Sequence, residues 1–178
     1  MALWGTTANV DEAKPKWLTA EQKKNVYATD RGWVQLDGKG LEEVIVAIGG
    51  LAGGTSAATG LGIATADYVN FVNTSYSEAG QGDLDVVVTF NERVTVTGSP
   101  QITITNSTTS ATYTATYLST SRNKLTFRVS NPAAVENDVL TVLGQPISLN
   151  GGTIVDYGTA LASDLNIPEV ASTLTVAA

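Results

Sequence analysis

The side chains that could carry out chemistry in this chain are mainly carboxylates, because the sequence contains no histidine and no cysteine. Without these residue types neither a Ser-His-Asp nor a Cys-His arrangement can form, so a hydrolytic site would depend on carboxylates or lysines. Asp83 and Asp85 lie two residues apart in a strand-like segment and therefore share a face. Paired carboxylates for acid-base catalysis normally come from opposite walls of a cleft. We interpret both as solvated acids at the start of a strand, and expect no enzymatic activity and no cofactor.

A calcium site is the alternative interpretation of the acidic residues. Asp83, Asp85, Glu78 and Asp156 could supply carboxylate oxygens, together with backbone carbonyl groups. Calcium requires several oxygens that converge on one point. Sequence spacing alone does not bring these four together, so our predicted site contains no metal ligand.

Tryptophan is the second residue type with a clear distribution. Trp4, Trp17 and Trp33 all lie near the start of the chain, and no tryptophan follows them. Tryptophan is enriched among the anchors of protein interfaces, and a unit of about 60 residues seldom stabilises itself alone. We predict that these rings bind a partner, and that Lys14 and Lys16 beside them suit an acidic partner surface. The alternative is that the rings pack on one another in a local core and that the lysines are solvated.

The last two-thirds of the chain have the two-residue period of half-buried strands. Leu84, Val86, Val88 and Phe90 fall on one face of an extended segment. Similar segments recur about every ten residues between clusters of Gly, Pro, Asn and Ser, which predicts an antiparallel all-β sandwich, with a closed barrel as the alternative. The predicted strands are 67–72, 84–90, 94–97, 101–105, 112–118, 124–129, 139–143, 147–149 and 172–176.

The start of the chain follows a different pattern. Thr19 and Gln22 are spaced as a capping box and predict a short helix that ends near Tyr27. Two runs of alternating apolar residues, 32–36 and 42–48, flank a loop that contains two glycines and predict a hairpin.

Residues 49–62 consist almost entirely of Gly, Ala, Ser and Thr, a composition typical of a flexible linker. We therefore expect three parts: an N-terminal docking region of extended arm, short helix and hairpin (1–48), a linker (49–62) and an Ig-like sandwich (63–178).

Charge and hydropathy limit the environment in which the chain is expected to act. The net charge is -7, with 17 acidic residues and 10 lysines and arginines, and nucleic-acid surfaces need clustered basic residues. The first residues lack the basic and apolar regions of a secretion signal, and no apolar run approaches the roughly 20 residues that span a bilayer. We expect no nucleic-acid or membrane partner, and synthesis as a soluble protein in the cytoplasm.

Three segments resemble the Ig-like repeats of bacterial surface proteins. They read VVVTFNERVTVTGSPQITIT, ATYTATYLSTSRNKLTFRV and LNGGTIVD, and they follow the order and spacing of those repeats over about residues 68–154. The resemblance implies an Ig-like β-sandwich. The chain departs from the repeats after Asp156, where Tyr157-Gly158-Thr159 replaces the usual small residues and Asn, so no calcium role is carried over to this loop.

The segments MALWG, KPKWLT and NVYATDRGWV resemble the opening of small virion structural proteins of tailed phages, particularly phages of marine bacteria. With a single Ig-like module, this resemblance implies a capsid decoration protein on the surface of the virion head. Its partner would be the major capsid protein, with contacts to further copies of itself left open.

Two other roles remain open. One is a neck or tail position in the virion. The other is recognition of host glycans by the Ig-like module, for which Thr112, Thr114 and Thr116 could form a flat surface. Our preferred interpretation of these threonines is the solvent face of an antiparallel sheet.

Overall fold

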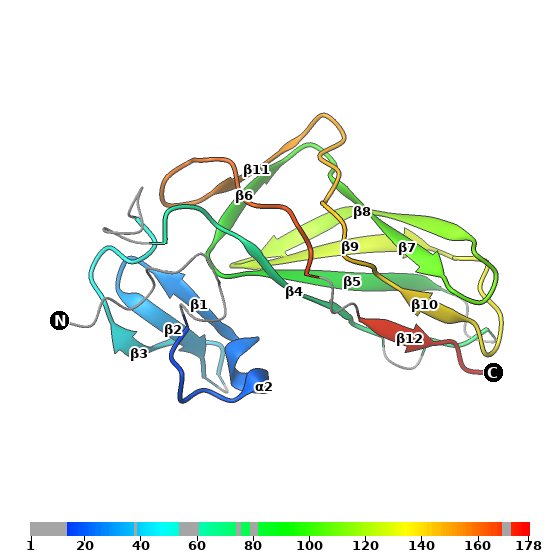
Figure 1. Cartoon of the computed structure of the whole chain (residues 1–178), viewed down its shortest axis with the longest axis horizontal. Helices are drawn as coiled ribbons and strands as arrows, with labels where there is room; N and C mark the ends of the chain where they lie inside the picture. The colour runs from blue at the N-terminus through cyan, green and yellow to red at the C-terminus, as the bar shows by residue number, and fades with distance from the viewer. Residues whose placement is uncertain (1–13, 38, 54–60, 74–75, 79–81, 169–171) are drawn as a thin grey trace. The chain divides into compact units, whose positions relative to one another are not determined.

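The computed structural model describes residues 14–37, 39–53, 61–73, 76–78, 82–168 and 172–178. The fold is all-β, with antiparallel sheets in a sandwich-like or barrel-like arrangement, which confirms the predicted fold class and is consistent with an Ig-like domain (Figure 1). In these ranges no helix is long and apolar enough to cross a membrane.

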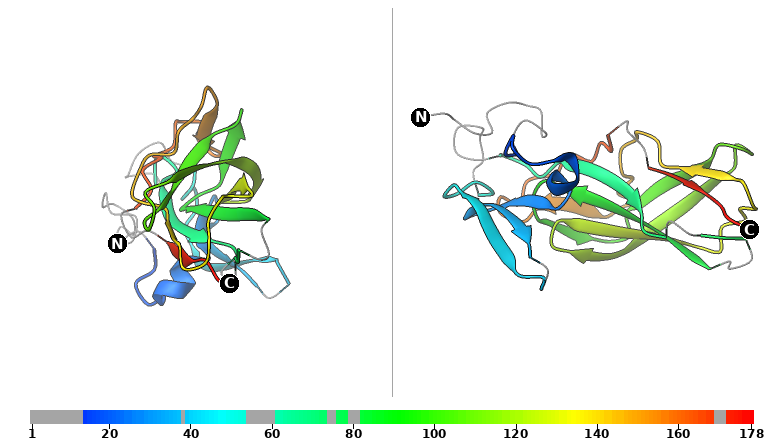
Figure 2. Two further views of the ribbon diagram at one scale, coloured as in Figure 1. Left: turned by 90° about the vertical axis from the view of Figure 1, so that its right-hand side faces the viewer. Right: turned by 90° about the horizontal axis from the view of Figure 1, so that it is seen from below.

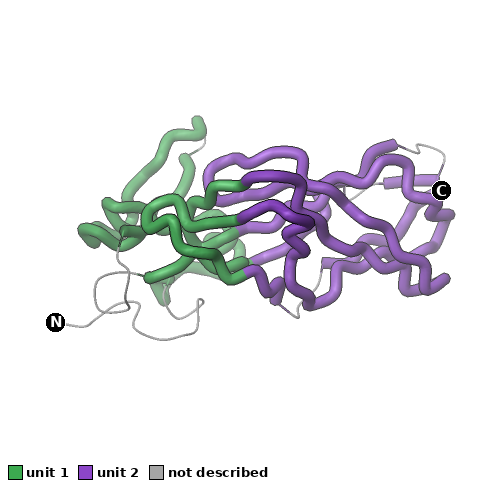
Figure 3. The backbone as a smooth tube through the Cα atoms, turned by 90° about the horizontal axis from the view of Figure 1, so that it is seen from above, with its two compact units in different colours: residues 1–67, 90–96, 154–164 green, residues 68–89, 97–153, 165–178 purple. Residues whose placement is uncertain are grey.

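The chain forms two compact units that both draw on distant parts of the sequence (Figure 3). Unit 1 comprises residues 1–67, 90–96 and 154–164, and unit 2 comprises residues 68–89, 97–153 and 165–178. Three short stretches of the predicted sandwich region, residues 63–67, 90–96 and 154–164, therefore pack with the N-terminal residues.

Unit 1 contains a short helix and a three-stranded antiparallel sheet of order β1-β2-β3. The helix α2 spans Ala20–Lys23, and the strands are β1 (Val26–Thr29), β2 (Gly32–Leu36) and β3 (Glu42–Ala47). The predicted hairpin is thus confirmed. So is the capping box, because the Thr19 side chain accepts a hydrogen bond from the Gln22 backbone and the Gln22 side chain accepts one from the Thr19 backbone.

The predicted helix end near Tyr27 is wrong. The helix stops at Lys23, and Tyr27 belongs to β1, a strand that the sequence analysis missed. All four residues of β1 are buried: the strand pairs with β2 along its length, Val26 and Ala28 belong to the core of unit 1, and the N–H of Ala28 donates to the carbonyl of Asn91. A strand buried on both faces has no polar-apolar alternation, so its period gives no signal.

The core of unit 1 forms around Val26, Ala28, Trp33 and Leu51. Leu51 comes from the predicted linker, and Leu61 from its other end packs against the same cluster. The backbone N–H of Leu61 donates to the carbonyl of Leu51 at 3.0 Å. The described ends of this segment are therefore packed parts of unit 1 rather than a free connector, while residues 54–60 lie outside the described ranges.

Later segments complete unit 1 through backbone hydrogen bonds. The N–H of Ala28 donates to the carbonyl of Asn91 at 2.7 Å, and the N–H of Asn91 donates to the carbonyl of Thr65 at 3.0 Å. The Asn91 side chain accepts from the N–H of Thr65 at 2.7 Å. Beyond this turn, β6 (Val94–Thr97) pairs with β11 (Thr153–Asp156), a strand that was not predicted.

Unit 2 is built on a seven-stranded sheet of order β12-β10-β7-β8-β9-β5-β4. Facing apolar residues fill its interior: Val86 lies opposite Phe127 and Val88 opposite Leu125, and all four are fully buried. The predicted alternation is thus confirmed in the central strands. The strands are β4 (Ala66–Phe71), β5 (Asp83–Phe90), β7 (Gln101–Asn106), β8 (Thr112–Ser121), β9 (Lys124–Ser130), β10 (Val139–Thr141) and β12 (Thr173–Thr175).

This sheet curves so that its two edges meet, as the turned views show (Figure 2). At one edge the N–H of Phe71 donates to the Ser172 hydroxyl at 3.2 Å, and the N–H of Ala177 donates to the carbonyl of Tyr76 at 2.9 Å. The predicted strand 147–149 is replaced by a single antiparallel bridge between Ser148 and Gln101. Curvature lets a single sheet enclose the apolar side chains of unit 2.

Candidate functional site

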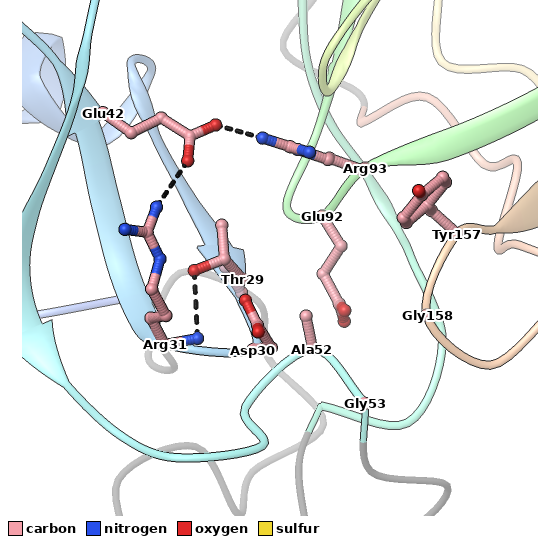
Figure 4. A pocket seen from close by; sticks show the side chains of 11 residues that line it. Thr29, Asp30, Arg31, Glu42, Ala52, Gly53, Glu92, Arg93, Tyr157 and Gly158 are labelled. Carbon is pink, nitrogen blue, oxygen red and sulfur yellow. Dashed lines mark hydrogen bonds and ion pairs between the residues drawn. The ribbon is translucent and has the colours of Figure 1, made fainter.

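The candidate site is a pocket of about 430 Å³ within unit 1. Its walls come from the turn between β1 and β2, from β3, from the loop after β3, from the turn before β6 and from the residues after β11 (Figure 4). The lining residues are Ala28, Thr29, Asp30, Arg31, Glu42, Ala52, Gly53, Glu92, Arg93, Tyr157 and Gly158.

The turn between β1 and β2 fixes one wall. The Thr29 hydroxyl donates to the carbonyl of Gly32 at 3.1 Å and accepts from the N–H of Arg31 at 3.3 Å. Gly32 has a φ of 122°, and a side chain here would overlap the carbonyl of Val46 on β3. Only glycine combines this backbone conformation with so close an approach, so the turn presents Asp30 and Arg31 at the rim.

Glu42 is the centre of a charge network on the second wall. Its carboxylate accepts from the Tyr27 hydroxyl and from Arg31, both at 2.7 Å, and forms a further ion pair with Arg93. Arg93 also lies over the Tyr27 ring, 6.0 Å from its centroid. This carboxylate is saturated by strong donors, so it is already neutralised.

The pKa values of this network follow from these contacts. Burial alone would raise the pKa of Glu42, but the hydrogen bond from Tyr27 and the charges of Arg93 and Arg31 outweigh it and hold that pKa below its ordinary value. Burial, and then the hydrogen bond to Glu42, raise the pKa of the Tyr27 hydroxyl. At neutral pH Glu42 is therefore ionised and Tyr27 keeps its proton.

A second acid of the lining, Glu92, lies beside Asp156 in the interior of unit 1. Glu92 and Asp156 are 2% and 1% exposed. The Asp156 carboxylate accepts from the N–H of Thr159 at 2.7 Å through Oδ1. Burial first, and then the negative charge of Asp156 and a hydrogen bond with it, raise the pKa of Glu92 to about 9. A pKa of about 9 keeps Glu92 protonated at neutral pH.

This arrangement can hold a proton and can accept hydrogen bonds or positive charge. The hydroxyl group of Thr29 is already engaged in its turn and is not paired with a base.

The predicted partner-binding residues lie elsewhere, and the structure separates them. Trp17 is 62% exposed and Lys16 is exposed as well. Trp33 is 1% exposed within the core of unit 1, as the local-core alternative required for this ring. Trp4 lies outside the described residues.

Lys14 is fully buried and forms an ion pair with Asp67. Its Nζ also donates to the carbonyl of Lys23 at 2.7 Å. Lys14 and Trp33 are therefore interior residues of unit 1, and a partner that binds the folded unit contacts neither of them. Of the predicted set, Trp17 and Lys16 remain at the surface.

Asp83 and Asp85, the two acids first considered for catalysis, form ion pairs in unit 2. Arg128 donates to both oxygens of Asp85, at 2.7 and 2.8 Å, and pairs with Asp83 at 2.8 Å. The hydrogen bond to Asp85 is the main reason that the pKa of Arg128 is raised. Within the described ranges no cluster of three or more metal-ligating side chains occurs.

Sequence reasoning missed Glu42, Glu92 and Arg93. The dipeptide Glu92-Arg93 lies in a short polar stretch between two strands, which is the ordinary composition of a turn. Its burial results from packing against segments more than sixty residues away in both directions, such as β1 and β11. The tetrad Phe90-Asn91-Glu92-Arg93 therefore carries no local signal of a site.

No family model matches this chain, and no curated protein and no solved structure matches it either.

Proposed function

We propose that this chain is a structural protein of a tailed-phage virion without enzymatic activity, a decoration protein that binds the major capsid protein through unit 1. The proposal draws on the resemblance of the N-terminal segments to virion proteins and on one structural observation. That observation is an apolar strand at the edge of the sheet of unit 1.

Strand β3 is this edge strand. In the order β1-β2-β3 it has a neighbour on one side only, and none of its six residues is buried. Ile45 and Val46 pack partly against the core of unit 1, whereas Val44 is 38% exposed. By contrast, all four residues of β1 are buried. Proteins normally cover or charge an exposed edge strand, since it offers apolar side chains and open hydrogen-bonding groups to other chains. An edge of this kind supports a docking role.

Further apolar side chains of unit 1 are exposed. Leu41, directly before β3, is 65% exposed, Val44 is 38% exposed and Trp17 is 62% exposed. Covering one such side chain contributes roughly 1.5–3 kcal/mol, and tryptophan is among the residues most often found at interface hot spots. Docking of these groups would support firm attachment of each copy, and a capsid offers many identical sites.

The decisive experiment compares two valine substitutions in the whole protein. Val44→Glu places a charge on the exposed edge of β3, and Val135→Glu places the same charge at an exposed valine of unit 2, which is 49% exposed. Binding of each variant to purified heads that lack the protein is measured by co-sedimentation. We expect Val44→Glu to weaken binding by at least about tenfold and Val135→Glu to bind like the parent protein.

Two results would reject the decoration role. If the parent protein does not bind heads, or if Val44→Glu binds as well as Val135→Glu does, the proposal is rejected. Labelling of neck or tail instead of heads would move the protein to another virion position. Binding of the full chain to a glycan array would favour the host-recognition role instead, for which the exposed Thr112 and Thr114 of β8 are the relevant surface.

Deletion of residues 1–48 is a poorer test than these substitutions. It removes β1, β2 and β3 and leaves residues 90–96 and 154–164 without the segments that they pack against. Loss of binding would then report a damaged fold as readily as a lost contact.

A further inference from the structure

Three exposed side chains that line the pocket of unit 1 have open hydrogen-bonding groups. Within the described ranges, the Asp30 carboxylate and the Tyr157 hydroxyl have no partner, and the Arg31 side chain uses only its NH2 group, in the pair with Glu42. Tyr157 is 68% exposed and the Arg31 side chain 55%. Figure 4 shows Arg31 and Tyr157 on opposite sides of the pocket. The pocket therefore offers acceptors, donors and an aromatic ring to a ligand.

Backbone contacts hold these three residues in place. The Thr29 hydroxyl bridges the turn that carries Asp30 and Arg31, since it donates to one side of the turn and accepts from the other. On the opposite wall, the N–H of Tyr157 donates to the carbonyl of Arg93 at 3.0 Å. A site whose walls are already ordered lowers the entropy cost of binding a ligand.

The formal charges of the lining cancel at neutral pH. Asp30 and Glu42 are negative, and Arg31 and Arg93 are positive. Glu92 adds no charge, because burial raises its pKa to about 9. The lining as a whole thus has no net preference for an anion or a cation. An apolar ligand is also disfavoured, because it would cover the charged groups without pairing them.

We infer that this pocket binds a neutral carbohydrate through one pyranose ring. Such a ring is uncharged, has hydroxyl groups that both donate and accept hydrogen bonds, and has an apolar face of C–H groups. The Tyr157 ring stacks against that face, the Asp30 carboxylate accepts from hydroxyl groups, and Arg31 donates to them. The inference goes beyond the virion role and does not depend on it.

The size and the smaller lining residues of the pocket suit one sugar ring. Its volume of about 430 Å³ lies within the roughly 300–1,000 Å³ of small-molecule pockets. Ala28, Ala52, Gly53 and Gly158 add small groups to the walls, so the carbon atoms of a ring can approach them closely. A side chain at Gly158 would overlap the carbonyl of Ala52, so this part of the wall is tightly packed.

The test is a titration of the full-length protein with the methyl glycosides of glucose, galactose, mannose and N-acetylglucosamine, followed by saturation-transfer NMR. We expect at least one glycoside to bind saturably, with a dissociation constant of about 1 mM, which ordinary ligand efficiency gives for about 13 heavy atoms. Because the ligand is uncharged, its affinity should change by less than about twofold between about 50 and 500 mM sodium chloride.

Two substitutions locate the sugar in the pocket. Asp30→Ala removes the open carboxylate and should weaken binding at least about tenfold, and Tyr157→Ala removes the aromatic face and should weaken it about fivefold. Glu136→Ala is the matched control, because it removes an exposed carboxylate of unit 2 and should leave binding unchanged. Tryptophan fluorescence checks that unit 1 of each variant is folded. Since the two substitutions change opposite walls, one remains informative should the other variant not fold.

Three results would overturn the inference: no saturable binding of any of these glycosides, parent-like binding by both pocket variants, or tighter binding of sodium acetate or glycine than of every glycoside. Binding that Thr114→Ala removes and both pocket variants retain would assign the sugar to β8 instead. The experiment involves no capsid. Failure of the sugar titration therefore rejects the carbohydrate pocket alone, and failure of head binding rejects the decoration role alone.

Discussion

The buried ion pair between Lys14 and Asp67 gives the sharpest prediction for the stability of unit 1. The Lys14 side chain is 0% exposed and the Asp67 side chain 5%. Replacing Lys14 by methionine keeps the aliphatic stem and removes the charge, so that Asp67 loses its ion-pair partner and the carbonyl of Lys23 loses a donor. Breaking a buried pair on one side typically costs about 3–5 kcal/mol. We expect the unfolding equilibrium of unit 1 to shift by more than about two orders of magnitude.

The chain carries its own probe for this measurement. Trp17 and Trp33 lie in unit 1, Trp33 is 1% exposed, and the sequence of unit 2 contains no tryptophan, so fluorescence during urea denaturation follows unit 1. Lys16→Met is the matched control, because Lys16 is exposed and such substitutions usually change stability by less than about 0.5 kcal/mol. The double variant Lys14→Met with Asp67→Asn should recover part of the loss, since it removes the unmatched charge.

A small effect would refute this reasoning. If Lys14→Met destabilises unit 1 no more than Lys16→Met does, then Asp67 is not held in a desolvated environment, and Lys14 returns to the set of surface residues available to a partner.

Three further predictions concern the turn, the buried acid and the interior of unit 2. Gly32→Ala should destabilise unit 1 by at least about 2 kcal/mol, whereas Gly40→Ala, also at positive φ but with open space around it, should cost about 1 kcal/mol by the same fluorescence assay. The pKa of Glu92 is raised to about 9 in the folded state, so folding takes up a proton at any pH between the ordinary pKa and 9. The unfolding free energy of unit 1 should therefore fall as pH rises from about 5 to 9, by at most about 1.4 kcal/mol per pH unit. Glu92→Gln should flatten this dependence, and an unchanged slope in this variant would contradict the prediction. In unit 2, the fully buried Asn106 side chain donates to Asp138 at 2.7 Å and accepts from two backbone N–H groups. Asn106→Ala should lower the unfolding free energy by about 2–3 kcal/mol, measured by far-UV circular dichroism during denaturation. A loss below about 1 kcal/mol would argue that water replaces the amide.

The sheet of unit 2 was predictable because its central strands bury one face. Leu84, Val86 and Val88 alternate with Asp85 and Val87, and the structure buries the three that the period selects, with Thr89 buried as well near the end of the strand. Sequence carries this information since a shift by one residue would move every apolar side chain to solvent.

Unit 1 was harder to predict because its order arises between distant segments. β1 has no alternation, and the capping box at Thr19 gave a true helix start but no end. The Gly-rich segment looked like a linker, yet Leu51 belongs to the core because the turn at Asp30 binds the backbone beside it, through the N–H of Gly50. Local composition indicates flexibility, but it does not show which distant residues will bind the segment.

The candidate site could not be found for the same reason. Glu92 and Asp156 are 64 positions apart in the sequence, and Lys14 and Asp67 are 53 apart. A carboxylate or a lysine in isolation is expected at the surface, and only a partner at long range makes its burial stable. Trp33 and Trp17 show the same limit, since identical side chains of one segment have opposite exposures.

The interleaving of unit 1 has a consequence for how the protein is made. Its first strands leave the ribosome well before residues 154–164, with which they form unit 1, have been synthesised. Growing chains usually fold their leading domain first, at about 5–20 residues per second. Here the first strands lack these later partners for several seconds. During that time Val44 and its neighbours remain uncovered in a crowded cell. A chaperone that shields this nascent hairpin would therefore have its main effect during translation rather than on the finished molecule.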